Sequence, residues 1–301
     1  MTSLDTSLRE RPAPRLPQGR RVRTPAHALP VPGMFRSPAL FPFAGPFRYP
    51  GLHLGLVAQV GLLAALTVTT GLHGAGWLTG AVVGLGTWVL LGSGLHGSGA
   101  RSLGAANGVT LGRTVLVGGI AALAAESFTR PAAVPVITGL TVVALLLDGV
   151  DGQVARRTGT ASALGARFDM EVDAFLILVL SVLLVGPVAP WVPAIGGMRY
   201  AFVLAGWVWP WLTAPLPPRF SRKVVAATQG AVLVAAVSGL LPGAVEAPLL
   251  ATALALLTWS FGRDVGWLVG RVRTTPRGRY AAAPSAAAPS ALPMAVPSRA
   301  R

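Results

Sequence analysis

Eight apolar segments, each close to the length that crosses a bilayer, dominate the sequence from residue 53 onward. A membrane helix needs about 20 mostly apolar residues, and in lipid only helices or closed barrels satisfy every backbone polar group. The composition agrees, since 52% of the 301 residues are hydrophobic and 12% are charged. The predicted spans are approximately 53–72, 77–95, 108–127, 132–156, 165–186, 198–214, 224–242 and 247–270. The chain is therefore predicted to be an all-α, polytopic integral membrane protein.

The stretch from Asp148 to Asp173 places acidic residues beside these apolar spans. It has 26 residues and holds five of the ten acidic residues of the chain. Carboxylates within a membrane are costly and are usually functional. Asp148 and Asp151 are spaced i,i+3, and Asp169 and Asp173 are spaced i,i+4, so each pair projects from one helical face. Two such pairs on neighbouring helices would form a cup of four carboxylates.

Four ionised carboxylates in one cup repel one another unless cations neutralise them. Two Mg²⁺ or Mn²⁺ ions would balance the four charges, and hard oxygen ligands suit these metals better than zinc or copper. The alternative is a structural cluster in which the acids pair with Arg156, Arg157 and Arg167, which are close in sequence.

The same stretch resembles the signature of the CDP-alcohol phosphatidyltransferase family. The matching positions are Asp148, Asp151, Gly152, Ala155, Arg156, Gly165, Asp169 and Asp173. The resemblance implies a homodimeric membrane enzyme with six core helices, which displaces CMP from a CDP-linked lipid or alcohol through an acceptor hydroxyl. It further implies that Asp148, Asp151 and Asp169 ligate the metal ions. Asp173 would contribute to the second ion and act as the base.

Small residues within the motif would let a nucleotide approach the backbone. Gly152, Ala155 and Gly165 carry no bulky side chain, so a cytidine diphosphate would lie close to the helices. Arg156 follows on the edge of this stripe and can offer a forked donor to phosphate. Ser162, between the two acidic helices, is a further candidate for phosphate contact, with an ordinary loop serine as the alternative.

A second polar cluster lies at the start of the third span, where Asn107, Thr110 and Arg113 have i,i+3,i+6 spacing on one helical face. It is similar to the polar opening of the family's first core helix, although Ala106 stands where a proline is usual. Asn107 and Thr110 are therefore predicted to bind the nucleotide. The alternative is that Asn107 caps the helix and Arg113 extends to the membrane interface.

A third cluster, Arg219, Arg222 and Lys223, precedes the seventh span. Family members with a phosphorylated acceptor hold its phosphate with basic residues from this region, and Lys223 resembles that position. The cluster favours inositol phosphate or glycerol phosphate as the acceptor. Simple anchoring by positive charge is the alternative. Arg199 is expected near the outer membrane boundary and outside the site, and Glu171 is expected to pair with Arg167 at i,i+4.

Glycines inside the spans are expected to be packing positions, because small residues let helices approach closely in lipid. This interpretation applies to Gly80 and Gly84 in the second span and to Gly104, Gly108 and Gly112 around the start of the third.

The distribution of basic residues predicts the orientation in the membrane. The chain carries a net charge of +15, concentrated in the terminal segments and in alternate loops. The positive-inside rule then places both termini and the acidic cup at the cytoplasmic face of the cell inner membrane. We expect a disordered basic arm (1–50), two accessory spans (51–100), a six-helix catalytic core (101–270) and a disordered basic tail (271–301). The basic residues form no folded, aromatic-interleaved surface, so no nucleic-acid partner is expected.

The predicted function is transfer of a phosphatidyl group from CDP-diacylglycerol to a polar alcohol, with release of CMP, in phospholipid biosynthesis. A competing class is a cation- or proton-coupled transporter, since intramembrane carboxylates also mark ion pathways. A transporter would more naturally carry inverted repeats and helices broken at the midplane. The acids of this chain gather near one membrane face, and they have no counterpart in the second half of the sequence.

Overall fold

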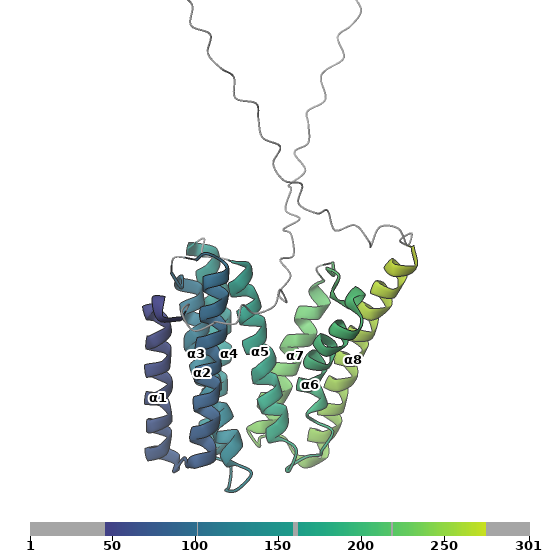
Figure 1. Cartoon of the computed structure of the whole chain (residues 1–301). Helices are drawn as coiled ribbons and strands as arrows, with labels where there is room; N and C mark the ends of the chain where they lie inside the picture. The colour runs from purple at the N-terminus through teal and green to yellow at the C-terminus, as the bar shows by residue number, and fades with distance from the viewer. Residues whose placement is uncertain (1–45, 101, 159–161, 218, 275–301) are drawn as a thin grey trace, which may run out of the picture. The chain divides into compact units, whose positions relative to one another are not determined.

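The computed structural model describes residues 46–100, 102–158, 162–217 and 219–274. Most of the predicted basic arm and tail therefore lies outside the described residues. The described residues form eight α-helices and no strand, as expected for an all-α chain (Figure 1). The helices are α1 (Pro50–Thr70), α2 (Gly74–Gly97), α3 (Ala105–Glu126), α4 (Val134–Thr158), α5 (Ala163–Leu183), α6 (Ala194–Val208), α7 (Phe220–Val237) and α8 (Gly243–Thr274). Two short 3₁₀ helices, η2 (Pro46–Arg48) and η3 (Pro210–Thr213), accompany them.

Five of the eight helices, α1, α2, α3, α7 and α8, combine the length and the low charge that a membrane span requires. The apolar part of α4 is shorter, Val134–Val150, because the helix continues into the acidic motif. Helix α5 carries Arg167, Asp169, Glu171 and Asp173 in its first half. Helices α4 and α5 bear the predicted acidic site, and they therefore depart from the pattern of a simple apolar span.

The sixth span differs from its predicted range, 198–214, because α6 ends at Val208. Pro210 accounts for the end of the helix. A proline has no backbone N–H to donate, and it disfavours the helical conformation in the residue before it. Trp209 accordingly has φ −119° and ψ 87°, and the chain continues as η3.

Helix α3 is the central helix of the described structure. It packs against α1, α2, α4 and α5, and 67% of its apolar span is buried, compared with 17–39% for the four other full-length spans. Fully buried Val117, Ile120 and Ala122 of α3 belong to one core with Leu180 of α5 and Leu233 of α7. The first core helix of the predicted catalytic unit is thus held on several sides.

Helices α1 and α2 pack against each other through small residues of α2, one of which lies against the buried amide side chain of Gln59. A Cβ at Gly80 would lie 2.5 Å from Leu63, and one at Gly84 would lie 3.0 Å from Gln59, so both glycines are packing positions as predicted. At Gly108 and Gly112 an added Cβ would meet no described atom within 4 Å, so the described residues show no close contact there. Gly104 has φ +77°, so its backbone conformation is the reason for a glycine there.

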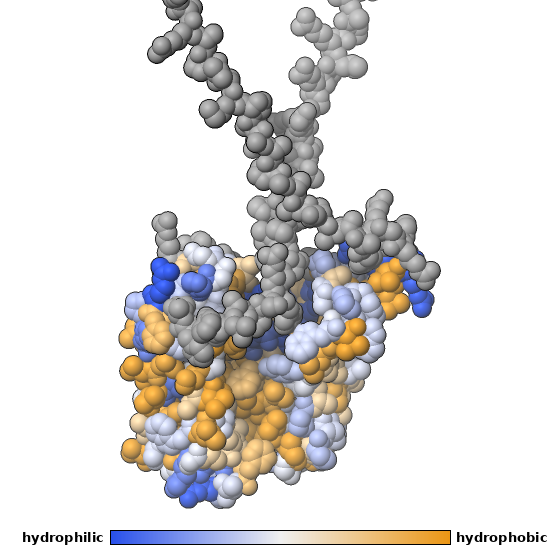
Figure 2. All heavy atoms as spheres, viewed as in Figure 1, coloured by the Kyte–Doolittle hydropathy of each residue, from blue (hydrophilic) through white to orange (hydrophobic). Residues whose placement is uncertain are grey.

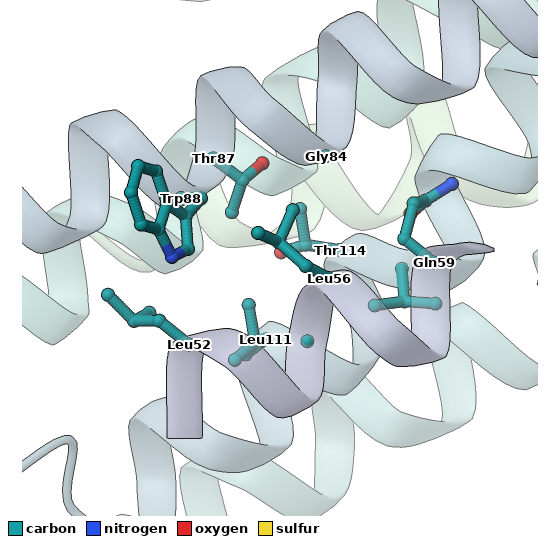
Figure 3. Close-up of a pocket in the computed structure, with 10 residues that line it drawn as sticks. Leu52, Leu56, Gln59, Gly84, Thr87, Trp88, Leu111 and Thr114 are labelled. Carbon is teal, nitrogen blue, oxygen red and sulfur yellow. The ribbon is translucent and has the colours of Figure 1, made fainter. Parts of the chain in front are cut away.

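A small pocket lies among α1, α2 and α3 (Figure 3). Its lining includes Leu52, Gln59, Trp88 and Thr114, and it contains no predicted site residue. The pocket lies where α1, α2 and α3 pack together, and none of the acidic residues of α4 and α5 lines it.

Apolar side chains cover the middle of the helices on the face drawn in Figure 2, and hydrophilic residues gather toward their ends. Leu54 and Val57 of α1 and Leu78 and Val82 of α2 are all more than half exposed. Large exposed apolar surfaces are unfavourable in water and natural in lipid. The chain is a multi-pass membrane protein.

Candidate functional site

Helices α4 and α5 carry the acidic motif on either side of a short connection. Ser162 ends this connection and caps α5, because its Oγ accepts a hydrogen bond from the Gly165 amide at 3.0 Å. A serine at this position satisfies one of the free amides of the first helical turn. The predicted phosphate contact of Ser162 is untested. The cap fixes where α5 begins, and therefore where Asp169 and Asp173 lie along it.

Three of the four predicted metal ligands lie together. Asp148 of α4 and Asp169 and Asp173 of α5 each offer one carboxylate oxygen, and these oxygens all lie within 4.8 Å of one another. Asp151 follows Asp148 by three residues on α4, but its side chain lies outside the description. The surroundings of Gly152 and the side chain of Arg156 lie outside the description as well. Asp169 and Asp173 are spaced i,i+4 on α5, and both side chains reach the same cluster, as predicted.

Among the described residues, Arg113 of α3 is a cationic partner of this cluster. Its guanidinium forms ion pairs with Asp148, with Asp169 (Nη1 to Oδ1, 2.9 Å) and with Asp173. The Arg113 side chain is only 1% exposed, so the alternative that it extends to the membrane interface is wrong. The alternative of a structural cluster considered only arginines close in sequence to the aspartates. It did not include Arg113, which lies on another helix.

The sequence spacing places Arg113 on the same helical face as Asn107 and Thr110 and does not link it to the acidic cluster. Its sequence separation from the aspartates ranges from 35 to 60 residues. The only signal was the shared face, because a helical periodicity does not say which helix lies opposite.

Asn107 joins the start of α3 to the start of α5. It is 7% exposed, its Nδ2 donates a hydrogen bond to the Leu103 carbonyl at 2.8 Å, and a Cβ on Gly165 would lie 2.3 Å from its Oδ1. Asn107 is not the cap of α3, because the N-cap residue is Gly104. Thr110, one turn later, is buried. The two predicted nucleotide-binding residues of α3 therefore lie on the helix that also supplies Arg113.

Glu171 points to a different helix from its acidic neighbours. At about 100° per residue it lies well away from the direction shared by Asp169 and Asp173. Its carboxylate pairs with Arg199 of α6, so the predicted pairing with Arg167 is wrong. Arg199 is therefore tied to Glu171, which lies within the acidic motif but outside the cluster of three aspartates.

The basic cluster before the seventh span ties α7 to α8. Arg222 Nε lies 2.7 Å from Asp264 Oδ2, and Arg263 Nη2 donates to Ser221 Oγ at 2.8 Å. Lys223, the predicted acceptor-binding residue, is exposed at the start of α7. Arg222 is thus occupied by a nearly buried carboxylate, whereas the Lys223 side chain faces outward.

The acidic cluster has the chemistry of a divalent-cation site. Its donors are carboxylate oxygens, which suit Mg²⁺ and Mn²⁺. The three aspartates and Arg113 together carry −3 + 1 = −2 formal charges. The carboxylates are partly open, with side-chain exposures of 42%, 35% and 47% for Asp148, Asp169 and Asp173. The residues present therefore fit one or more divalent cations.

The fold and this cluster define a class of protein: a multi-pass helical membrane protein with an acidic, metal-competent site on α4 and α5. The model of the family described as CDP-alcohol phosphatidyltransferase matches residues 103–261, which extend from just before α3 into α8. The chain belongs to the CDP-alcohol phosphatidyltransferase family. Searches of curated proteins and of solved structures gave no match. Membership supports a transferase, and the family uses divalent metal; the division of the chain into arm, accessory spans, core and tail stays a prediction.

Proposed function

We propose that this protein transfers a phosphatidyl group from CDP-diacylglycerol to the hydroxyl of a polar alcohol and releases CMP. The observation that carries the proposal is the meeting of Asp148, Asp169 and Asp173 within 4.8 Å, in a chain that belongs to this family. The site would take Mg²⁺ or Mn²⁺, two ions in the full arrangement with Asp151. We place it at the cytoplasmic face of the inner membrane, where the positive-inside rule orients the basic loops.

The reaction breaks one phosphorus–oxygen bond and forms another. The acceptor oxygen attacks the phosphorus of the phosphatidyl group, and the bond to the CMP oxygen breaks. Asp173 accepts the proton of the attacking hydroxyl, since a carboxylate near the reacting oxygen can act as a general base. When bound by the aspartates, divalent cations would neutralise charge on the pyrophosphate and on the leaving CMP.

Other residues of this chain would bind and orient the two substrates. Asn107 and Thr110 of α3 and Arg156 of α4 would contact the cytidine diphosphate, and Gly152 and Gly165 would leave room for it. Ser162 would add a phosphate contact at the start of α5. Arg156 is suited to binding phosphate because its guanidinium can donate two parallel hydrogen bonds to phosphate oxygens.

Lys223 would hold the phosphate of the acceptor. Its exposure at the start of α7 supports this role, since a flexible ammonium group is free to reach a ligand. We therefore propose inositol phosphate or glycerol phosphate as the acceptor. A second copy of the chain would complete a homodimer, which the mass of the detergent-purified protein would report.

The proposal is tested by identifying the product. The full chain in detergent is incubated with CDP-diacylglycerol, Mg²⁺ and one alcohol at a time, and lipids are analysed by mass spectrometry. We expect a phosphatidyl product with a phosphorylated polyol and an equal amount of CMP. Asp173→Asn should abolish both products, while Glu171→Gln, whose carboxylate faces α6, should retain most of the activity. Equal activity of Asp173→Asn and wild type would refute the assigned base, and cation transport without CMP release would favour the transporter.

A further inference from the structure

Arg113 contacts the acidic cluster from its buried side. The guanidinium on α3 reaches Asp148 of α4 and both Asp169 and Asp173 of α5, so one side chain connects three helices. Arg113 is 1% exposed, whereas each of the three carboxylates is 35–47% exposed. The aspartates are thus open on one side and supported by a cation on the other.

The buried guanidinium of Arg113 and the three carboxylates stabilise one another at this site. Burying a guanidinium is strongly unfavourable unless it is paired. Removing one member of a buried ion pair is strongly destabilising, because the other charge is left buried without its partner. Three neighbouring carboxylates would likewise repel one another without a counterion. Arg113 offsets only part of the negative charge of Asp148, Asp169 and Asp173, so negative charge remains for divalent metal to neutralise.

We propose that Arg113 is a positioning residue that serves as an internal counterion, holding the three aspartates together before metal binds and leaving the charge that metal then neutralises. This inference rests on the proposed metal-dependent function and adds a residue to it. Arg113 and the metal neutralise the same carboxylates, so each reduces the need for the other. Stabilisation by metal should therefore be larger when Arg113 is replaced.

The test measures thermal unfolding of the full chain in detergent, followed by the fluorescence of its eight tryptophans. Wild type, Arg113→Gln and Arg113→Lys are compared in EDTA and in saturating Mn²⁺. In EDTA we expect the midpoint of Arg113→Gln to fall by roughly 5–15 °C, because three carboxylates lose their counterion. Arg113→Lys keeps the charge and should lose less. Saturating Mn²⁺ should raise the midpoint of Arg113→Gln at least about twice as much as that of wild type.

Arg222→Gln provides a matched control, since Arg222 also pairs with a nearly buried carboxylate, that of Asp264, outside the acidic cluster. It should lower the midpoint by a similar amount in EDTA and in Mn²⁺. If the loss in Arg113→Gln is also the same with and without Mn²⁺, Arg113 only packs α3 and the inference is overturned. If Mn²⁺ fails to stabilise even wild type, the proposed metal site fails instead, so the two failures are distinguishable.

A second variant keeps the test decisive if Arg113→Gln accumulates too poorly to measure. Adding Asp148→Asn to Arg113→Gln removes one of the uncompensated charges. We expect the double variant to accumulate better and to unfold at a higher temperature in EDTA than Arg113→Gln. A double variant no better than Arg113→Gln would contradict a counterion role.

Discussion

At the scale of single residues, Gly165 lies where the first turn of α5 meets the first turn of α3. An added Cβ would lie 2.3 Å from Asn107 Oδ1 and 3.1 Å from Ser162 Oγ. Both contacts are shorter than ordinary van der Waals distances, so a larger residue must move Asn107 or the start of α5. The position is thus sensitive for packing reasons, independently of any nucleotide that approaches it.

Gly165→Ala should therefore reduce CMP release by about tenfold or more, because overpacking costs about 1–3 kcal/mol and displaces a predicted nucleotide-binding residue. The measurement is the steady-state rate at saturating metal. Gly112→Ala on α3 is the matched control, since its Cβ would meet no described atom within 4 Å. Equal rates for both variants would show that the contact at Gly165 is unimportant.

Contacts of the site could be predicted from the sequence where they depend on local spacing, and could not where they depend on which helices lie side by side. The aspartates were predicted to meet because their spacing and their helices are local features of the sequence. Arg113 was missed and Glu171 was assigned the wrong partner, because both pair with residues on other helices. Local periodicity specifies a face of a helix and leaves its neighbour undetermined.

At the scale of helices, α5 and α6 approach closely through one glycine. A Cβ at Gly196 of α6 would lie 2.2 Å from the Cα of Leu178, which is backbone and cannot rotate away. The next residue, Gly197, has no described atom within 4 Å of its Cβ position. Comparing substitutions at these two neighbouring glycines therefore distinguishes the effect of helix packing from the effect of helix propensity.

Gly196→Ala should destabilise the protein by about 1–3 kcal/mol or more, because α5 and α6 must separate. Gly197→Ala should be neutral or slightly stabilising, since alanine favours helix by up to about 1 kcal/mol. Thermal unfolding midpoints in one detergent give the comparison. A similar fall for both variants would contradict the close packing of α5 on α6.

The existence of the eight helices could be predicted from apolar length, and their ends could be predicted less well. Helix α6 ends at Val208 rather than near residue 214, because the effect of Pro210 outweighs the apolar sequence that continues beyond it. Packing was predicted correctly for Gly80 and Gly84, whereas no described atom lies within 4 Å of a Cβ added at Gly108 or Gly112. Small residues permit close approach, but whether another helix approaches depends on the whole bundle.

At the scale of the whole molecule, eight described helices place the two ends of the helical region on the same side if each crosses the membrane. The chain contains no cysteine, so single cysteines can be introduced without a background. Ser98 follows α2 and Thr129 follows α3, and both residues are exposed. The two positions should therefore lie on opposite membrane faces.

In intact cells, an impermeant maleimide should label Thr129→Cys and should label Ser98→Cys only after lysis. This pattern follows from the positive-inside orientation, which places the arm, the α2–α3 turn and the acidic cluster in the cytoplasm. Labelling of both sites in intact cells, or the reverse pattern, would contradict that orientation.

The central claim is that the acidic cluster on α4 and α5 binds divalent metal, and that the protein then releases CMP from a lipid nucleotide. Its most direct test is CMP release from CDP-diacylglycerol by the chelator-treated full chain, titrated with Mg²⁺ or Mn²⁺ in the presence of the acceptor. We expect no release in EDTA and recovery with either ion, and no recovery when Asp148, Asp169 or Asp173 is changed to Asn. Undiminished release in EDTA, or full activity of all three variants, would contradict the claim.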